Sequence, residues 1–295
     1  MARHRSRCWC RRRARGLIRL IGLRSLRGER GEAPVPEEPV LLSYDGAVAI
    51  VTNNRPERHN AASDAFNKRL WEVFYAIHVN PDVRCVLWRG NGPSFSSGRD
   101  LKELGGPREG GISNLQHIER GHNWTQMLLT CPAPIICALN GWTIGGMFER
   151  ALLCDLRIAG ESVRLWLSEL QHGVVPDSGG VARLFQIAGH GLASDMALTG
   201  RVMGAQEALG HGIVSRVVPD DDLEATGLEM AQQIAKLPAF TVKMFRRDLR
   251  RMATRLVQES IDEEAILQAQ VYTSDDYAEF KAAKAEGREP QFRNR

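Results

Sequence analysis

The sequence contains no long hydrophobic run. Of its 295 residues 43% are hydrophobic, yet no uninterrupted apolar stretch approaches the roughly 20 residues that a membrane-spanning helix requires. A repeat of fixed period is also absent, as is any low-complexity segment after residue 40. The length suits a globular chain with one large hydrophobic core or two smaller ones.

Cysteine and histidine patterns typical of metal sites are missing as well. The six cysteines stand at positions 8, 10, 85, 131, 137 and 154 without a CxxC pair, and the eight histidines show no HExxH spacing. We therefore expect no metal site. Cys85, Cys137 and Cys154 fall in apolar patterns, so we interpret them as reduced thiols in the core of an intracellular protein.

Acidic residues are nearly absent from the N-terminal stretch, where the positive charge is concentrated. Residues 1–30 hold 11 arginines, no lysine and a single acid, Glu29. The remaining residues carry 28 basic and 34 acidic side chains, so that the net charge of +4 for the whole chain becomes −6 without this stretch. Because the globular part is acidic, we expect it not to bind nucleic acid.

Three interpretations of the Arg-rich leader compete. It resembles an organelle transit peptide, which is rich in Arg and poor in acids, or a disordered basic arm that binds membrane or nucleic acid. The third is upstream sequence that is translated because the start codon was placed too early. Residues 31–39 hold three prolines and form a linker, so we expect residues 1–39 to be disordered. The expected location is cytoplasmic, or mitochondrial if the leader is a transit peptide.

Short strands alternate with helices along the rest of the chain. Residues 40–44 and 47–52 flank Asp45-Gly46, a strong hairpin signal, and a helix is predicted to begin after its N-cap Ser63. Further helices are predicted at 114–130, 181–188, 192–199 and 205–210, with a strand at 214–218. The alternation predicts an α/β core over 40–220, and long helices at 221–236 and 241–270 make 221–295 a helical region.

The chemically most informative stretch runs from Asn140 to Asp155. A short apolar strand is predicted at 134–139, and Gly145 and Gly146 then lead into a helical pattern. The first N–H groups of a helix have no intrahelical partner, and glycine lets a ligand approach the main chain closely. Glu149 follows one turn later, so N–H donors for a developing negative oxygen and a carboxylate for proton transfer share one segment.

A second set of free N–H groups is predicted after the buried strand at 85–88. A turn at 90–93 leads through Ser97 and Gly98 into a predicted helix start at Arg99. Residues 105–111, with four glycines and a proline, are predicted to form a mobile loop. The sequence thus predicts two separate helix starts at which backbone N–H groups are free.

Taken in order, these segments resemble the crotonase superfamily, the enoyl-CoA hydratase/isomerase family. The resemblance covers about residues 40–295. The matching segments are Asn54-Arg-Pro-Glu-Arg-His-Asn60, Phe95 to Leu104, Pro134 to Gly141, Gly145-Gly146 with Glu149, Cys154-Asp155, Pro176 to Gly180, Leu198-Thr-Gly200 and Ala208 to Val217. Single pieces are weak signals, whereas the whole series in this order is highly specific.

The resemblance implies a spiral of ββα units with a helical C-terminal part that closes homotrimers, often dimers of trimers. It implies that the backbone amides of Arg99 and Gly146 form an oxyanion hole for the thioester of an acyl-CoA substrate, each where a helix begins. It also implies that the coenzyme A side of the site is lined by residues 97–102, with no cofactor beyond the substrate's own coenzyme A. These residues are Ser97, Gly98, Arg99, Asp100, Leu101 and Lys102, with Gly146 opposite.

The resemblance further implies an acid–base pair, Glu149 and Glu169. Adding water to an α,β-unsaturated thioester requires a base that activates water and an acid that protonates Cα, so two carboxylates suit a 2-enoyl-CoA hydratase, a carbon–oxygen lyase. The first alternative is a Δ3–Δ2 enoyl-CoA isomerase, in which Glu169 alone moves a proton, or another acyl-CoA lyase or isomerase of the crotonase type. The alternative of another class is a non-catalytic or RNA-binding scaffold that uses the basic leader.

The chain departs from the typical hydratase at three positions near this pair. Met147 and Phe148 stand where a glycine and a small residue are usual, and their side chains could narrow the acyl pocket or turn Glu149 aside. Asp177 replaces a glycine and brings a third carboxylate, whose charge would couple to the pair; isomerases of the family also have Pro-Asp here. Ser168, His172 and Asp177 superficially offer a catalytic triad, which we set aside because closeness in sequence is not triad geometry.

Lys243 and Arg246 are basic residues of the predicted helix at 241–270. They could meet coenzyme A phosphates, but Arg247, Arg250 and Arg251 beside them favour a solvated basic face.

Overall fold

The computed structural model describes residues 38–103 and 111–293, and the chain from Glu38 on forms one compact unit. The predicted disorder of the leader and nearly all of the predicted mobile loop lie outside the described residues. None of the helices in the described ranges has the length and apolar character to cross a membrane.

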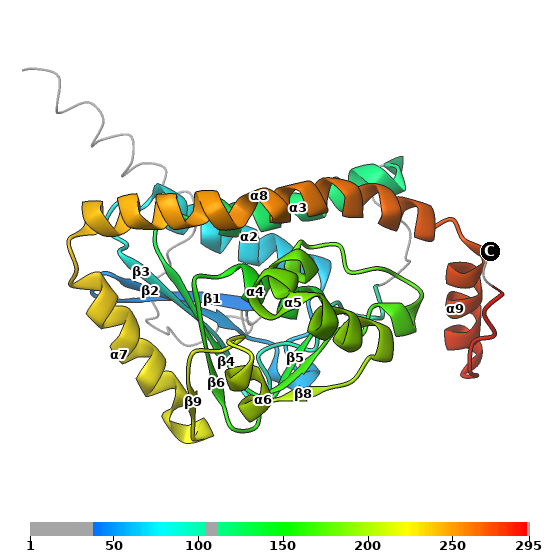
Figure 1. The fold of residues 1–295 in the computed structure, drawn as a ribbon, viewed down its shortest axis with the longest axis horizontal. Helices are drawn as coiled ribbons and strands as arrows, with labels where there is room; N and C mark the ends of the chain where they lie inside the picture. Colours follow the sequence, from blue (N-terminus) through cyan, green and yellow to red (C-terminus); the bar gives the residue numbers. More distant parts are fainter. Residues whose placement is uncertain (1–37, 104–110, 294–295) are drawn as a thin grey trace, which may run out of the picture. The chain divides into compact units, whose positions relative to one another are not determined.

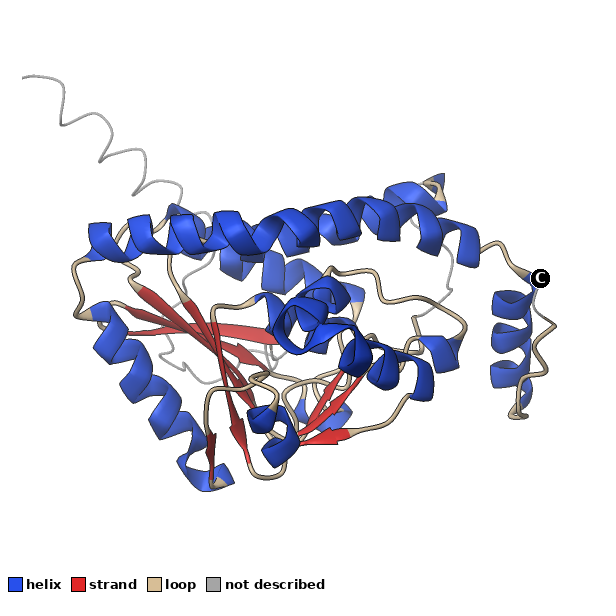
Figure 2. Ribbon diagram, in the orientation of Figure 1, coloured by secondary structure: helices blue, strands red, loops and turns tan. Residues whose placement is uncertain are grey.

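A six-stranded sheet organises the unit, with the strand order β1-β2-β3-β4-β6-β9 (Figures 1 and 2). The predicted hairpin is present: β1 (Val40–Asp45) pairs antiparallel with β2 (Val48–Asn53). All later neighbours are parallel, namely β3 (Cys85–Gly90), β4 (Ile135–Leu139), β6 (Leu156–Gly160) and β9 (Val217–Val218). Every residue of β4 is buried, as expected of a central strand covered on both faces.

A second, three-stranded sheet contains β5 (Trp142–Ile144), β7 (Arg164–Trp166) and β8 (Met203–Gly204). β4 is followed by β5 and then by α4 (Gly146–Leu153), and β6 is followed by β7 and then by α5 (Gly180–Thr199). Each turn of the chain thus adds one strand to the large sheet, one to the small sheet and one helix. This repeated order confirms the predicted spiral of ββα units.

Helices cover both faces of the large sheet. On one face α2 (Asp64–Val79), α4 and α5 enclose the main core, which includes Phe66, Trp88 and Phe148. The predicted N-cap is present, because the Ser63 hydroxyl accepts the Phe66 N–H. On the other face α7 (Leu223–Ala235) packs against β3 and β4. Here Gly227 lies so close to the sheet that a methyl group on it would approach Leu87 Cδ1 to 2.9 Å.

The C-terminal region is helical, as predicted. After α6 (Ala205–Gly210) and α7, helix α8 (Ala239–Val271) runs alongside α3 (Asn114–Thr130) and also contacts α5 (Figure 1). The last helix, α9 (Asp275–Glu286), packs Tyr277 and Phe280 against Val174. Three short 3₁₀ turns, η1 (Pro56–Arg58), η3 (Leu170–His172) and η4 (Asp220–Asp222), complete the described elements.

The two helices predicted at 181–188 and 192–199 are both present: α5 consists of two helical stretches that meet at a kink at Gly189, where φ is 81°. Two predictions need correction. The strand predicted at 214–218 is reduced to the two residues of β9. Arg246 does not lie on a solvated face or near a phosphate site: its buried side chain donates to Asp155 Oδ1 and Oδ2 at 2.5 and 2.6 Å.

Candidate active site

Arg99 lies in a short strand-like bridge rather than at the start of a helix, and this bridge sets the direction of its N–H. Ala62 forms a parallel bridge to Arg99, with the Ala62 N–H donating to Gly98 O and the Asp100 N–H donating to Ala62 O. In a trans peptide the C=O and the next N–H point in opposite directions. Because Gly98 O points to Ala62, the Arg99 N–H points away from it. The predicted helix start at Arg99 is therefore wrong, whereas a free N–H at this residue is compatible with the geometry.

Gly146 presents its N–H in the predicted way, at the first position of α4. The Gly145 C=O accepts the Glu149 N–H at 2.9 Å, so the Gly146 N–H points out of the start of the helix. Gly145 has φ 57° and ψ −137°, a conformation that favours glycine. Neither the Arg99 N–H nor the Gly146 N–H donates a hydrogen bond to any described residue outside its own element.

The two segments that carry these amides run side by side. Ser96 bridges Thr143 in parallel register, with the Ile144 N–H donating to Ser96 O at 3.0 Å. A methyl group on Gly98 would lie 2.9 Å from Ile144 O, so the close approach continues beyond the bridge. The two segments therefore lie together as far as Gly98 and Ile144, each one residue or two before its amide. Each amide follows a glycine with positive φ, 83° at Gly98 and 57° at Gly145.

Glu149 lies on α4 with no exposed surface. Its Oε2 accepts the Ser178 and Gly180 N–H groups at 3.2 and 3.0 Å, while Oε1 has no partner among the described residues. Burial raises the pKa of Glu149 well above its ordinary value, and the charges of Glu169, Glu264 and Asp177 add to the increase. Glu149 can therefore hold a proton at a pH where an exposed glutamate cannot.

Glu169 lies immediately before η3 and directs its carboxylate at the glycine pair. A methyl group on Gly145 would meet Glu169 Oε1 at 2.7 Å, so this carboxylate lies directly beside the glycine. Burial raises the pKa of Glu169 to about 7, with a further contribution from the charge of Asp177. Its Oε2 has no partner among the described residues. The structure thus brings the two glutamates close to each other and to Gly145-Gly146.

Asp177 is the third carboxylate of this cluster. Burial raises the pKa of Asp177 to about 6, although Arg150, the Ser178 hydroxyl and Arg99 counteract the increase. Arg150 follows Glu149 on α4, donates to Asn67 Oδ1 at 2.8 Å and lies 5.9 Å from the centre of the Trp124 ring. Burial lowers the pKa of Arg150 to about 10. The expected charge coupling between Asp177 and the glutamate pair is therefore present.

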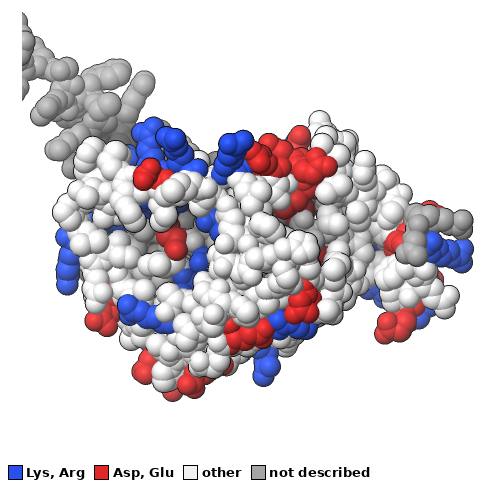
Figure 3. Space-filling model, viewed as in Figure 1, with Lys and Arg blue, Asp and Glu red and all other residues white. Residues whose placement is uncertain are grey.

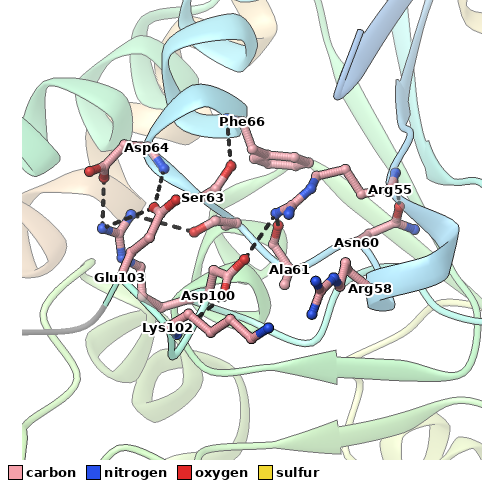
Figure 4. Close-up of polar contacts among 12 residues, drawn as sticks. Arg55, Arg58, Asn60, Ala61, Ser63, Asp64, Phe66, Asp100, Lys102 and Glu103 are labelled. Atoms are coloured by element: carbon pink, nitrogen blue, oxygen red, sulfur yellow. Dashed lines mark hydrogen bonds and ion pairs between the residues drawn. The ribbon is translucent and has the colours of Figure 1, made fainter. Parts of the chain in front are cut away.

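The segment proposed to line the coenzyme A side, residues 97–102, is held by a network of polar contacts (Figure 4). Asp100 forms an ion pair with Arg55 at 3.2 Å, and its Oδ1 accepts the Lys102 N–H. The Arg99 side chain turns away to Asp64, at 2.6 Å, so only the backbone of residue 99 is available to the site. Leu101 offers its C=O to Lys284 of α9 at 2.6 Å, and Lys102 is exposed.

The comparisons with known proteins agree with this geometry. The family model described as enoyl-CoA hydratase/isomerase matches residues 43–295. The chain belongs to the enoyl-CoA hydratase/isomerase family. It is 31% identical over 258 residues to a probable enoyl-CoA hydratase of Mycobacterium bovis, covering 88% of this chain and 99% of the relative. A 1,2-epoxyphenylacetyl-CoA isomerase of Escherichia coli is also 31% identical, over 86% of this chain and 98% of the relative.

Solved structures of the family share the fold. An enoyl-CoA hydratase/isomerase from Pseudoalteromonas atlantica superposes with a TM-score of 0.79 at 31% identity, over 86% of this chain and 100% of that chain. An enoyl-CoA hydratase from Bacillus anthracis has a TM-score of 0.68 at 30% identity, over 87% and 100%. The chain is therefore an enzyme of a family whose members act on acyl-CoA substrates.

The family resemblance left open what the unusual residues near Glu149 do. Met147 and Phe148 are 1% and 0% exposed and belong to the main core, so both side chains point away from accessible space. His172 does not form a triad with Ser168 and Asp177: its Nδ1 lies 2.7 Å from the Ser168 backbone oxygen, and its ring meets Phe280 edge-on.

Sequence reasoning missed the contribution of α8 to the buried carboxylate cluster around Glu149. Glu264 Oε2 accepts the Gly179 N–H at 2.8 Å, and Gln268 Oε1 accepts the Val175 N–H at 2.9 Å. Both side chains are buried. The only signal in the sequence is their spacing of four residues, which places two polar side chains on the same face of a helix as Val257 and Ile261.

Proposed function

We propose that the protein is a 2-enoyl-CoA hydratase. The observation that supports this best is the pair Glu149 and Glu169, two carboxylates with raised pKa values beside the Gly145-Gly146 turn. Coupled carboxylates that share a proton near neutral pH provide a base and an acid at the same time. Hydration of an enoyl thioester needs both in one step or in two closely linked steps.

In the proposed reaction the thioester oxygen accepts the N–H groups of Arg99 and Gly146. The ionised carboxylate of the pair takes a proton from water as the water oxygen bonds to Cβ. The Cα=Cβ electron pair then moves toward the thioester, whose oxygen gains negative charge and is stabilised by the two N–H donors. The protonated carboxyl of the pair gives its proton to Cα. The pair ends with the same number of protons as it had at the start.

The N–H donor of Gly146 can be tested without changing a catalytic side chain. Proline is tolerated at the first position of a helix but lacks an N–H, so Gly146→Pro removes the donor from α4. Gly146→Ala is the matched control, because its methyl group would lie at an ordinary contact distance, 3.5 Å, from Ser178 Oγ. We expect Gly146→Pro to lower kcat by about 10²–10³ and Gly146→Ala to retain most activity. Equal activity of the two variants would refute the proposal that the Gly146 N–H binds the thioester oxygen.

The carboxylate pair is tested by assaying crotonyl-CoA hydration and 3-enoyl-CoA isomerisation with Glu149→Ala and Glu169→Ala. A hydratase loses hydration by about 10²–10⁴ in either variant. Full hydration activity in Glu149→Ala would contradict the two-carboxylate mechanism. Glu161→Gln, which changes an exposed residue between β6 and β7, serves as the control.

A Δ3–Δ2 enoyl-CoA isomerase is the second candidate. The pKa of Glu169, about 7, suits a group that takes a proton from one carbon and returns it to another at neutral pH. This candidate predicts isomerisation that depends on Glu169 and persists in Glu149→Ala. The two assays therefore separate the candidates.

We also propose a homotrimer or a dimer of trimers, supported by the exposed face of α8. Phe240, Phe245 and Met252 are 74%, 67% and 67% exposed, unusual for side chains of this size on a free surface. In Figure 3 basic side chains lie over the first part of α8 and acidic ones over the part that follows. Light scattering should show Phe245→Lys dissociating the oligomer, while Leu198→Ser, which changes an exposed leucine on α5, leaves it intact.

The leader supports a proposal of another class, a scaffold that binds RNA. Deleting residues 1–36 separates the two functions: an enzyme keeps its turnover, whereas a scaffold loses a salt-sensitive affinity for RNA.

We propose a cytoplasmic location, with mitochondrial import as the alternative. Fractionation of cells that express the full chain tests this location. We further propose that the reaction needs no cofactor beyond the substrate's coenzyme A, because the carboxylate pair supplies both proton transfers.

A further inference from the structure

Three consecutive amides at the start of α5 point alternately at two glutamates. The N–H groups of Ser178 and Gly180 donate to Glu149 Oε2, and the N–H of Gly179 between them donates to Glu264 Oε2 at 2.8 Å. Gly179 has φ 76°, a conformation that lets neighbouring amides turn to opposite sides. One turn of backbone thus connects a carboxylate of α4 with a carboxylate of α8.

Glu264 is held firmly in this position. Its second oxygen, Oε1, accepts the Ser260 hydroxyl at 2.6 Å, and the side chain is buried. Both oxygens therefore have a donor, unlike those of Glu149, whose Oε1 has none among the described residues. The hydrogen bonds of Glu264 suit a carboxylate that orients neighbouring backbone, whereas Glu149 keeps one oxygen available for proton transfer.

The backbone around Gly179 has little room to move. A methyl group on Gly179 would meet Ile261 Cγ1 at 2.7 Å, and one on Gly180 would meet Glu149 Cα at 2.3 Å. Gln268 fixes the same segment a few residues earlier, at the Val175 N–H. Helix α8 therefore holds the segment between Val175 and Gly179 at both ends.

We propose that Glu264 is a positioning residue that acts on Glu149 through the Ser178–Gly180 turn. By accepting the Gly179 N–H, it fixes the peptide plane so that the two flanking amides point at Glu149 Oε2. When ionised, Glu264 also disfavours the ionised form of Glu149 and so helps to keep a proton on the glutamate pair. Burial raises the pKa of Glu264 itself. This role rests on the proposed hydratase function and adds a residue from the C-terminal helix to the acid–base machinery.

Several other charges face Glu149 and must be considered in any pH dependence. Glu169 and Asp177 add negative charge, and Arg150 on the same helix adds positive charge. His122 of α3 lies beside Asp177 O, and its pKa is lowered by burial, while the charge of Glu264 opposes this decrease. The variant Glu264→Gln changes none of these groups. It keeps an oxygen that can accept the Gly179 N–H, removes the charge, and places an NH2 group where Oε1 accepted the Ser260 hydroxyl.

The test compares Glu264→Gln and Glu264→Ala with Glu263→Gln, a control that removes one charge from the exposed face of the same helix. Infrared difference spectra of the enzyme without substrate follow the carboxyl C=O band of protonated Glu149, which is assigned by its loss in Glu149→Gln. We expect the midpoint of its titration to move to lower pH in Glu264→Gln and to stay unchanged in Glu263→Gln. In crotonyl-CoA hydration, Glu264→Gln should lower kcat less than Glu264→Ala does, because it keeps an acceptor for the Gly179 N–H.

Glu264→Ala removes the acceptor for the Gly179 N–H, so we expect kcat to fall by about a hundredfold with little change in KM, because a small misplacement of a reacting group has effects of this size. An unchanged infrared midpoint in Glu264→Gln overturns the proposal, as does full kcat in Glu264→Ala. If Glu264→Ala does not fold, the midpoint of the Gln variant still decides. A wild-type enzyme that does not hydrate crotonyl-CoA refutes the hydratase function, yet leaves the infrared test of Glu264 valid.

Discussion

Replacing Glu169 by glutamine should make the protein more stable at alkaline pH, although it removes activity. The folded protein raises the pKa of Glu169 from 4.5 to about 7, chiefly through burial. The unfolded chain has no such burial, so it favours the ionised form at a lower pH. Ionisation of Glu169 is therefore a cost to the fold that a neutral glutamine of the same shape avoids.

The size of the effect follows from the pKa difference. A shift from 4.5 to about 7 corresponds to about 3 kcal/mol, since each pKa unit is worth about 1.4 kcal/mol. Because the folded pKa is the higher one, the stabilisation by the protonated form is complete below about pH 4.5 and is lost as the pH rises through about 7. Glu169→Gln should therefore equal the wild type near pH 4.5 and exceed it by about 3 kcal/mol at pH 8.

The assay is urea unfolding at both pH values and at one fixed protein concentration, so that association contributes equally. Glu161→Gln is the control, because it removes a carboxylate from an exposed position and should show no pH-dependent gain. The reasoning is refuted if Glu169→Gln gains nothing at pH 8, or if it gains the same amount at both pH values. The second outcome would indicate better packing rather than relief from a buried charge.

Three further predictions concern the frame around the site. Arg246→Ala should lower the free energy of unfolding by about 3–5 kcal/mol, because it leaves the carboxylate of Asp155 without its buried partner. Calorimetry or urea unfolding measures this loss. The double variant Arg246→Met with Asp155→Asn should recover part of it. Gly180→Ala should abolish hydration, because its methyl group would lie 2.3 Å from Glu149 Cα, whereas Gly191→Ala, in open space on the same helix, should retain activity and gain up to about 1 kcal/mol. Dialysis against EDTA should leave kcat unchanged, and a loss that added divalent metal restores would contradict the proposed proton transfers.

Much of the fold could be predicted because its signals are local. The hairpin around Asp45-Gly46, the N-cap at Ser63 and the glycine pair before α4 depend on a few neighbouring residues. The family was recognised from the order of such segments. An error occurred where the signal was ambiguous: the chain after Gly98 forms a bridge to Ala62 instead of a helix. Gly98 is compatible with either a helix start or an extended segment, and pairing with Ala62 selected the extended segment.

The sequence by itself determined which residues belong to the candidate site, because Arg99, Gly146, Glu149 and Glu169 all stand in segments that match the family. Only the tertiary structure decided how these groups are tuned. Burial and neighbouring charge raise the pKa values of the glutamates, and Glu264 reaches the same turn of backbone from 85 residues beyond Gly179. Helix periodicity and turn formation depend on residues that are close in the sequence. Desolvation and charge coupling depend on side chains that meet only after folding.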